Sequence, residues 1–230
     1  MVLSSRSEEK LNAILQSLPG EGHRILPIDV SNTNSIQEAL RSNQNIVSQV
    51  DVLVNNAGIS QRALMLDTSL ETERSIMETN YFGATALTKA VLPGMVERKN
   101  GTIIVMSSPA GAFGFPLRSS YSASKHALHG YFDTLRAELK GSGIGITLAL
   151  PGRVKTNMSI NAMTGDGSKQ GTMDDRLNAG MEPDDCAKKI MSAAARGKAE
   201  LYLGREQMLI YVKRFFPSLF RRIVTNFNPN

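Results

Sequence analysis

The sequence predicts an α/β fold, a doubly wound parallel sheet of the Rossmann-like kind with helices on both faces. Short apolar runs alternate with longer segments of helical apolar spacing, and glycine or proline stands at many of the boundaries between them. With 230 residues, of which 41% are hydrophobic and 20% charged, the chain has the usage of an ordinary globular protein. We therefore expect one Rossmann-like domain over residues 1–230.

The expected strands are short and mostly β-branched, as strands buried on both faces of a parallel sheet are. They are residues 24–28, 50–54, 102–106, 144–150 and 200–203. Apolar spacing of the helical period predicts helices over residues 8–18, 35–48, 71–97, 119–140 and 183–195. Strand and helix in alternation imply parallel strands joined by helical crossovers. The polar, glycine-containing stretch 159–180 is expected to be a loop.

The first residues read as the end of a strand, because Val2 and Leu3 lead into a Ser-Ser-Arg turn and then a helix. A dinucleotide-binding sheet normally opens with a strand, a glycine-rich turn and a helix. No such turn precedes Ser5, so we expect a fold truncated at its N-terminus by about one strand-turn-helix, with two strands left without ladder partners. A true short form and an incomplete sequence are both consistent with this pattern, and the short form would bind a dinucleotide weakly.

Net charge, cysteine content and the length of apolar runs indicate the cellular compartment and the kinds of binding partner. The net charge of +5 favours anionic partners, among them dinucleotide phosphates and acidic lipids. The only cysteine, Cys186, allows no internal disulfide, which fits a reducing compartment. No apolar run reaches the roughly 18 residues that span a bilayer. We expect a cytoplasmic protein with no nucleic-acid partner, and a peripheral membrane contact stays open.

A tyrosine and a lysine four residues apart are the strongest chemical signal. Tyr121 and Lys125 lie on one face of a predicted helix. A phenol has a pKa of about 10, and a neighbouring ammonium favours its ionised form, so the pair can act as an acid or base. Ser108 lies thirteen residues before Tyr121, where a strand opens into the ligand crevice. The alternatives are a surface tyrosine beside a solvated lysine and a serine that only caps a turn.

Five segments in order resemble the short-chain dehydrogenase/reductase family. They are Asn55-Asn56-Ala57-Gly58, Asn80 in Asn-Tyr-Phe-Gly, Ser108, Tyr-Ser-Ala-Ser-Lys at 121–125 and Pro-Gly-Arg-Val-Lys-Thr at 151–156. The resemblance implies hydride transfer between a nicotinamide and a carbonyl or alcohol carbon, without a metal, and a homodimer or homotetramer.

The resemblance also implies a role for each catalytic residue. Tyr121 would be the general acid/base, and Lys125 would lower its pKa and hold the nicotinamide ribose. Ser108 would orient the carbonyl. Asn80 would sit on a helix irregularity and position a water. The alternative for Asn80 is a helix amide satisfied by nearby backbone.

Cofactor contacts are implied at the ends of several strands. The resemblance assigns them to Asp29, Val30, Asn55, Ala57, Gly58, Tyr121, Lys125, Gly152, Val154 and Thr156. After the first strand stands Arg6, and no acid occurs before Glu8. Because an arginine there accommodates a 2′-phosphate and an acid the 2′-hydroxyl, we expect NADP(H) rather than NAD(H). The alternatives are that Arg6 only begins a solvated helix and that Asp29 caps a helix.

The C-terminal segment 205–230 interleaves basic and aromatic residues around Pro217, including Lys213, Arg214, Arg221 and Arg222. A peripheral membrane contact is one interpretation; packing over the substrate cleft or against a second subunit is the other.

Apolar side chains on either side of the expected site indicate an apolar carbonyl or alcohol substrate. They are Met158, Met163, Met173 and Met181 on one side and Phe113, Phe115 and Leu117 on the other. The sequence leaves the physiological substrate and the direction open. A second function class also stays open, a catalytically silent binding or scaffold protein without a complete cofactor site.

Overall fold

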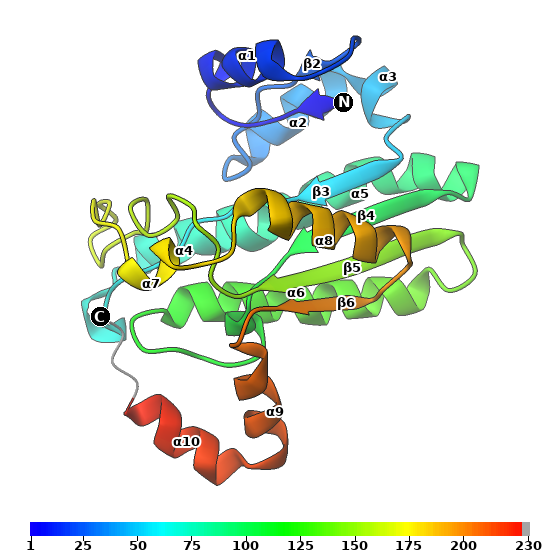
Figure 1. Cartoon of the computed structure of the whole chain (residues 1–230). Helices are drawn as coiled ribbons and strands as arrows, with labels where there is room; N and C mark the ends of the chain where they lie inside the picture. The colour runs from blue at the N-terminus through cyan, green and yellow to red at the C-terminus, as the bar shows by residue number, and fades with distance from the viewer. Residues whose placement is uncertain (227–230) are drawn as a thin grey trace.

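The strands form two parallel ladders. β3 (Val52–Asn55), β4 (Gly101–Met106), β5 (Ile144–Pro151) and β6 (Glu200–Leu203) make a sheet in the order β3-β4-β5-β6, and β1 (Val2–Leu3) pairs with β2 (Arg24–Ile25). The computed structural model describes residues 1–226, without the side chain of Arg176. The predicted α/β fold with parallel strands is confirmed (Figure 1).

Successive side chains of the four-stranded sheet point to opposite faces, and helices cover both faces. Ile103 and Val105 of β4 pack with α5 (Gly83–Arg98) and α6 (Ser119–Glu138), whereas Ile104 between them packs with α8 (Pro183–Ala195). The first cluster also contains Val91, Met95, Leu128, Phe132 and Leu148, and the second Ala149, Cys186 and Ile190. Helices therefore cover both faces, as a doubly wound sheet requires.

The N-terminal unit is built from β1, α1 (Glu8–Ser17), β2, α2 (Thr33–Ser42) and α3 (Gln44–Val47). The segment 35–48, predicted as one helix, is broken at Asn43, whose backbone has φ −126° and ψ 33°. The amide of Asn43 donates to the Ala39 carbonyl at 2.9 Å, a local bond that competes with helix continuation. The second strand ends at Ile25, three residues earlier than predicted.

The two ladders are joined through helices. The backbone of Val30 lies so close to α5 that a Cβ on Gly83 would come within 2.6 Å of the Val30 carbonyl, and Arg98 donates to the carbonyls of Ser48 and Val50. Within residues 1–226, no strand pairs with the outer edge of β1 or of β3. β1 and β3 are edge strands, each with one ladder partner, β2 and β4 respectively. The expected truncation at the N-terminus stays a prediction.

One long helical segment carries an irregularity. The range 71–97, predicted as a single helix, consists of α4 (Leu70–Met77), a π-helical turn over Glu78–Phe82 and α5. A π turn inserts a residue into the helical period and changes the direction of the side chains on it. Asn80 lies within this turn and is buried, so the expected helix irregularity at Asn80 is confirmed.

A loop closes over the carboxyl ends of β4 and β5. It contains the short helix α7 (Asp175–Asn178), and backbone bridges tie Met163 to Gln61 and Val154 to Met181. The predicted loop 159–180 is therefore a loop held against the body at several points. In Figure 1 this loop and α7 lie at one end of the sheet, beside α4.

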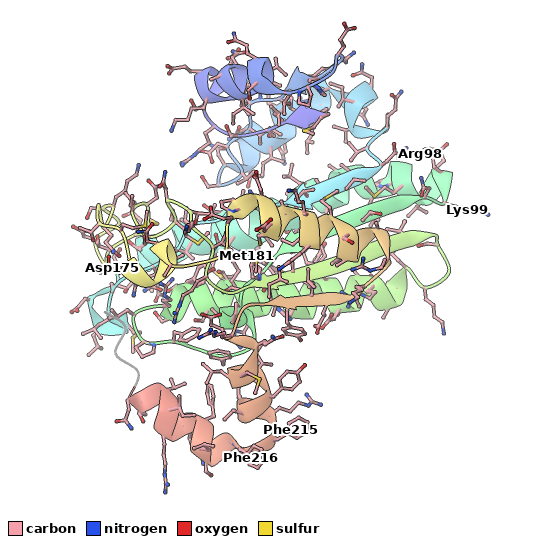
Figure 2. All side chains as sticks on the ribbon, viewed as in Figure 1. Arg98, Lys99, Asp175, Met181, Phe215 and Phe216 are labelled. Carbon is pink, nitrogen blue, oxygen red and sulfur yellow. The ribbon has the colours of Figure 1, made fainter. Side chains whose placement is uncertain are left out.

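The C-terminal segment forms two helices, α9 (Gln207–Phe215) and α10 (Pro217–Thr225), which break at Phe216. They project from the body on the side opposite β1 and β2 (Figure 1), and Figure 2 labels Phe215 and Phe216 at the turn between them. Residues 227–230 of the predicted segment 205–230 lie outside the described residues. In the described part of the chain, none of the helices has the length and apolarity needed to cross a bilayer.

Candidate active site

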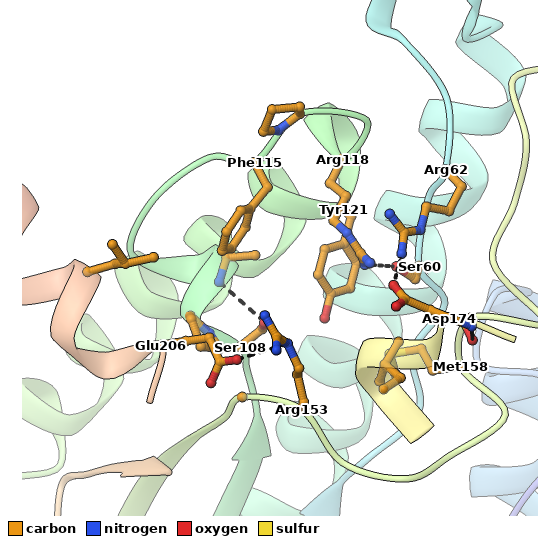
Figure 3. Close-up of a pocket in the computed structure, with 17 residues that line it drawn as sticks. Ser60, Arg62, Ser108, Phe115, Arg118, Tyr121, Arg153, Met158, Asp174 and Glu206 are labelled. Atoms are coloured by element: carbon orange, nitrogen blue, oxygen red, sulfur yellow. Dashed lines mark hydrogen bonds and ion pairs between the residues drawn. The ribbon is translucent and has the colours of Figure 1, made fainter. Parts of the chain in front are cut away.

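Ser108 and Tyr121 line one cavity at the carboxyl ends of β4 and β5 (Figure 3). Ser108 follows β4, where its hydroxyl accepts a hydrogen bond from the Ala110 amide at 3.2 Å and so begins a short helical turn. Tyr121 lies in the first turn of α6 and is 5% exposed. Ser108 thus makes the capping bond of the alternative interpretation and also lines the cavity beside Tyr121.

A residue that the sequence analysis missed holds the start of α6. The N-cap residue of α6, Arg118, makes no capping bond with its side chain. Instead the fully buried Gln61 accepts from the backbone amides of Ser120 at 2.8 Å and Tyr121 at 3.3 Å. It also donates to the Ser119 hydroxyl at 3.2 Å. No local signal marks Gln61, because it lies about sixty residues before the helix that it caps.

The structure corrects the expected electrostatics of the tyrosine and lysine pair. Burial raises the pKa of Tyr121, and a hydrogen bond with Ser108 and the positive charge of Arg118 offset this only in part. The Lys125 Nζ lies 5.8 Å from the centre of the Tyr121 ring and donates to the Met106 carbonyl at 2.7 Å. The prediction that Lys125 lowers the pKa of Tyr121 is therefore wrong for this structure, since burial dominates and the ammonium is directed at a backbone oxygen.

Lys125 is itself perturbed. It is 3% exposed, and burial lowers its pKa to about 8. A buried ammonium with a lowered pKa is typical of functional sites, although structural burial has the same effect.

Asn80 connects the loop after β3 with α6. Its amide nitrogen donates to the Ile59 carbonyl at 3.0 Å and to the Ser124 hydroxyl at 2.9 Å, and its oxygen accepts from the Ile59 amide at 2.8 Å. A Cβ on Gly58 would lie 3.3 Å from the Asn80 oxygen and 3.5 Å from the Lys125 Nζ. Because Gly58 has no side chain, the space beside the Asn80 oxygen and the Lys125 ammonium is left free.

The other predicted cofactor residues lie at the carboxyl ends of parallel strands. Arg6 follows β1, and Asp29 and Val30 follow β2. The pKa of Asp29 lies below its ordinary value: burial raises it, but two hydrogen bonds from Ser31 and the nearby charge of Arg6 together outweigh that effect. Asp29 is not the N-cap of α2, because Asn32 has that position.

The predicted residues after β3 and β5 differ in exposure. Asn55 is 6% exposed and donates to the Thr88 hydroxyl at 3.0 Å, while Ala57 is exposed. Gly152 lines the cavity of Ser108 and Tyr121, and it also lines a neighbouring cavity together with Val154. Thr156 is exposed. The structure thus brings Asn80, Gly58, Lys125 and Tyr121 together around α6, with Arg6 and Asp29 in the N-terminal unit.

Some of the apolar residues that were predicted to flank the site line the cavity, and others do not. Phe115 and Met158 line the cavity, as expected. Phe113 is fully buried and contacts Phe220, with 5.3 Å between ring centres. Met181 lines the neighbouring cavity. Among the described residues, Leu117, Met163 and Met173 line neither cavity.

Charged residues in the cavity were not anticipated. Arg62 forms an ion pair with Asp174, and Arg153 pairs with Glu206 at 3.1 Å. Arg118 donates to the Ser60 hydroxyl at 2.6 Å. These residues come from three loops and from the start of α9, so only the folded chain brings them together (Figure 3).

The model of the short chain dehydrogenase family matches residues 1–166 of the chain. The chain belongs to this family. Its relatives among curated proteins include a dehydrogenase/reductase SDR family member 7B from Xenopus laevis, 38% identical over 236 residues, which cover 98% of this chain and 73% of the relative. A dehydrogenase/reductase SDR family protein 7-like from Anopheles gambiae is 42% identical over 210 residues, with 88% and 66% covered.

Solved structures of short-chain dehydrogenases have the same fold. A short-chain dehydrogenase from Streptomyces avermitilis superposes with a TM-score of 0.81 at 26% identity, covering 97% of this chain and 85% of the other. The closed form of a serine dehydrogenase complexed with NADP+ gives a TM-score of 0.74 at 28% identity, over 88% of this chain and 82% of that one. The family binds nicotinamide cofactors, and this short-chain dehydrogenase/reductase is therefore an oxidoreductase.

Proposed function

We propose that this short-chain dehydrogenase/reductase uses NADP(H) to interconvert an apolar carbonyl compound and its alcohol, with Tyr121 as the acid/base. The observation that carries the proposal is the shared cavity of Ser108 and Tyr121 at the carboxyl ends of β4 and β5. Ligands bind at this edge of open α/β sheets. The same edge carries Lys125 and Asn80 within the hydrogen-bond network around α6.

The raised pKa of Tyr121 favours its role as a proton donor. A neutral phenol gives its proton to the oxygen of a carbonyl as negative charge develops there. The Ser108 hydroxyl can donate to the same oxygen, or to the phenolate that is left behind. Bound NADPH supplies the hydride that adds to the carbonyl carbon. The reverse reaction begins from the phenolate, so a raised pKa favours reduction over oxidation at neutral pH.

The residues around α6 fit the nicotinamide end of such a cofactor. The space beside Gly58 is bordered by the Lys125 ammonium and the Asn80 oxygen, polar groups suited to ribose hydroxyls. Gly152, Val154 and Thr156 follow β5 and would face the carboxamide. Asn55 and Ala57 would let the backbone approach the cofactor after β3, and Asp29 and Val30 would meet the adenine.

NADP(H) is favoured over NAD(H) by the arginine after β1. Arg6 is exposed and lies near Asp29. A guanidinium binds a phosphate through charge-assisted hydrogen bonds, and the ribose 2′-phosphate distinguishes NADP(H) from NAD(H). The serine dehydrogenase complexed with NADP+ supports the proposal by similarity.

Turnover with a tyrosine variant tests the function. NADPH oxidation is measured with a panel of medium-chain and cyclic ketones for the native chain, Tyr121→Phe and the control Tyr211→Phe, whose tyrosine is 52% exposed. We expect Tyr121→Phe to lower kcat about a thousandfold with little change in NADPH affinity, and Tyr211→Phe to leave kcat unchanged. Native chain that binds NADPH but reduces none of the ketones would instead favour the silent binding protein, and equal rates in all three would remove Tyr121 from the chemistry.

A peripheral membrane contact is a second candidate property, favoured by the surface of α9 and α10. Met208, Phe215, Phe216 and Leu219 are between 50% and 65% exposed, and Arg214, Arg221 and Arg222 lie among them. An exposed apolar surface with cations around it suits the interface of an acidic bilayer.

Liposome co-sedimentation tests the contact. We expect binding to vesicles with phosphatidylserine and loss of binding in the double variant Phe215→Ser/Phe216→Ser. Ile14→Ser, which removes an exposed apolar side chain on α1, serves as control, since Ile14 is 49% exposed. Equal sedimentation of the native chain with and without vesicles would contradict the contact.

An assembly of two or four copies also stays a prediction. Exposed apolar residues on the helical segment from α4 to α5, Phe82 at 49% and Val96 at 43%, offer surface for it. Light scattering during size-exclusion chromatography measures the mass, and a monomer at micromolar concentration would contradict the assembly.

A further inference from the structure

Three arginines line the cavity of Ser108 and Tyr121, and they differ in their partners. Arg62 and Arg153 each pair with a carboxylate, Asp174 and Glu206 respectively. For Arg118, no carboxylate among residues 1–226 comes within the 4.0 Å of an ion pair. Its guanidinium donates to the neutral hydroxyl of Ser60 at 2.6 Å.

Arg118 is placed where a substrate must lie. Its guanidinium carbon is 5.9 Å from the centre of the Tyr121 ring. Figure 3 shows the guanidinium beside Tyr121, with Ser60, Arg62 and Asp174 next to it. Since Tyr121 and Ser108 line the same cavity, a molecule that reaches them also passes Arg118.

Burying the charged guanidinium of Arg118 costs free energy, and a bound anion would offset this cost. Burial lowers the pKa of Arg118 and the neighbouring cation of Arg62 lowers it further, while the charges of Tyr121 and Asp174 offset this only in part. An arginine has five N–H donors, and one is directed at Ser60. The group of Arg62, Arg118 and Asp174 has two positive charges and one negative, so its net charge is +1. This local charge attracts an anion even with Asp174 present.

We propose that Arg118 forms an anion subsite of this cavity, which binds a carboxylate or phosphate group of the substrate. The inference rests on the proposed function and deepens it: the substrate is an apolar carbonyl compound or alcohol that carries an anionic group. The apolar part lies against Phe115, Met158 and Leu209, and the anion lies on the side of Ser60 and Arg118. Arg62 and Arg153 have a different role, because their ion pairs tie the loop 151–182 and α9 to the cavity wall.

Direct binding tests the subsite without any turnover. Octanoate, its methyl ester and octyl phosphate share one apolar chain and differ in charge at the head, and isothermal titration measures the affinity of each for the full chain. We expect octanoate to bind at least about tenfold more tightly than methyl octanoate, because charge-assisted hydrogen bonds are the stronger kind. Tighter binding of octyl phosphate than of octanoate would identify the phosphate as the preferred group, and the reverse order the carboxylate; both orders support the subsite.

Variants assign the preference to Arg118. In Arg118→Met the preference for octanoate over its ester should fall to about twofold or less, whereas Arg41→Met, which removes an exposed arginine on α2, should preserve it. Arg118→Lys keeps the charge without the planar fork and should retain part of the preference, which keeps the test open if the methionine variant fails to fold. Octanoate that binds no better than its ester, or a preference that survives Arg118→Met, overturns the subsite.

The two proposals can fail separately. Tyr121→Phe should preserve the preference for the anion while it removes turnover. A native chain that shows the preference and reduces no ketone would keep the subsite and defeat the oxidoreductase chemistry of Tyr121. A chain that reduces neutral ketones through Tyr121 and shows no preference would do the opposite.

Discussion

The four-stranded sheet and the N-terminal unit hold different residues of the candidate site, and the sheet is much more deeply buried than the N-terminal unit. In β4, Ile103, Ile104 and Val105 are fully buried between helices on both faces. In β1, Val2 is 39% exposed, and each strand of that ladder has two residues. Ser108, Tyr121 and Lys125 depend on the first region, whereas Arg6 and Asp29 depend on the second.

This difference separates proton transfer from cofactor selection. Local stability within a protein follows buried apolar contact and protected backbone hydrogen bonds. The position of Tyr121 is fixed by a deep core and by Gln61, so we expect it to persist if the N-terminal unit opens locally. The position of Arg6 depends on a unit with few buried residues, among them Leu11, Ile28 and Ile36.

Truncating one core residue in each region measures the difference directly. Phe132→Ala, in the fully buried core of α6, should lower the free energy of unfolding by about 4 kcal/mol. Ile36→Ala, in α2, should cost about 2 kcal/mol and should act mainly on local opening of residues 1–50. Urea unfolding followed by circular dichroism measures the first, and hydrogen exchange of the α2 amides measures the second. Equal losses of global stability in both variants would show that the two regions unfold as one unit.

Within the four-stranded region, Asn80 ties the loop after β3 to α6. Asn80→Leu leaves the amide and carbonyl of Ile59 without their partner inside the protein. Two unsatisfied polar groups should lower the free energy of unfolding by about 3 kcal/mol. The exposed Asn45→Leu is the control and should change it by less than about 0.5 kcal/mol. A thermal shift of Asn80→Leu no larger than that of the control would mean that water replaces the lost bonds.

The sequence predicted the bounds of α8 and β6 closely. The bounds of α8 agree with the predicted 183–195, because Cys186, Ile190 and Ala194 place one apolar face of this helix against the sheet. β6 has the predicted bounds 200–203, although each of its four residues is only partly buried. The second strand is shorter than predicted, and Asn43 and the π turn interrupt two predicted helices. These interruptions depend on side-chain bonds and helix packing, which the apolar pattern does not record.

Some residues of the candidate site could be predicted from local spacing, and others could not. Spacing along one helix and one strand end pointed to Ser108, Tyr121 and Lys125. In the structure Ser108 and Tyr121 line one cavity, and the Lys125 Nζ lies 5.8 Å from the centre of the Tyr121 ring. Gln61 and Arg118 were missed, because both lie in loops whose positions follow from contacts distant in sequence. The hydrogen bond from the Lys125 ammonium to the Met106 carbonyl could not be predicted from the sequence either. This bond, together with burial, explains why the predicted lowering of the Tyr121 pKa was wrong.

The buried Lys125 predicts a pH dependence that belongs to the four-stranded region. Burial lowers its pKa from 10.5 to about 8. Below pH 8 the folded chain holds a charged, buried ammonium, which costs stability. Between pH 8 and 10.5 the folded state has released the proton that the unfolded state still binds, so the cost diminishes as pH rises.

The free energy of unfolding of the native chain should therefore rise, relative to Lys125→Met, by about 2 kcal/mol between pH 8 and pH 9.5. Urea titrations of both proteins at these two pH values give the difference, in which the titration of groups common to both cancels. Parallel changes in the two proteins would show that Lys125 keeps its proton through this range.

The smallest expected effect concerns selectivity in the N-terminal unit. Arg6→Asp replaces the proposed phosphate partner with a carboxylate, which repels a 2′-phosphate and accepts a hydrogen bond from a 2′-hydroxyl. NADPH affinity should fall about tenfold relative to NADH affinity, which is about 1.4 kcal/mol. Because Arg6 is exposed, the free energy of unfolding should stay unchanged. Fluorescence titration with both cofactors measures the ratio, and Arg41→Asp is the control at an equally exposed arginine. An unchanged ratio in Arg6→Asp would move the recognition of the phosphate away from β1, and with it the link between cofactor selection and the less stable region.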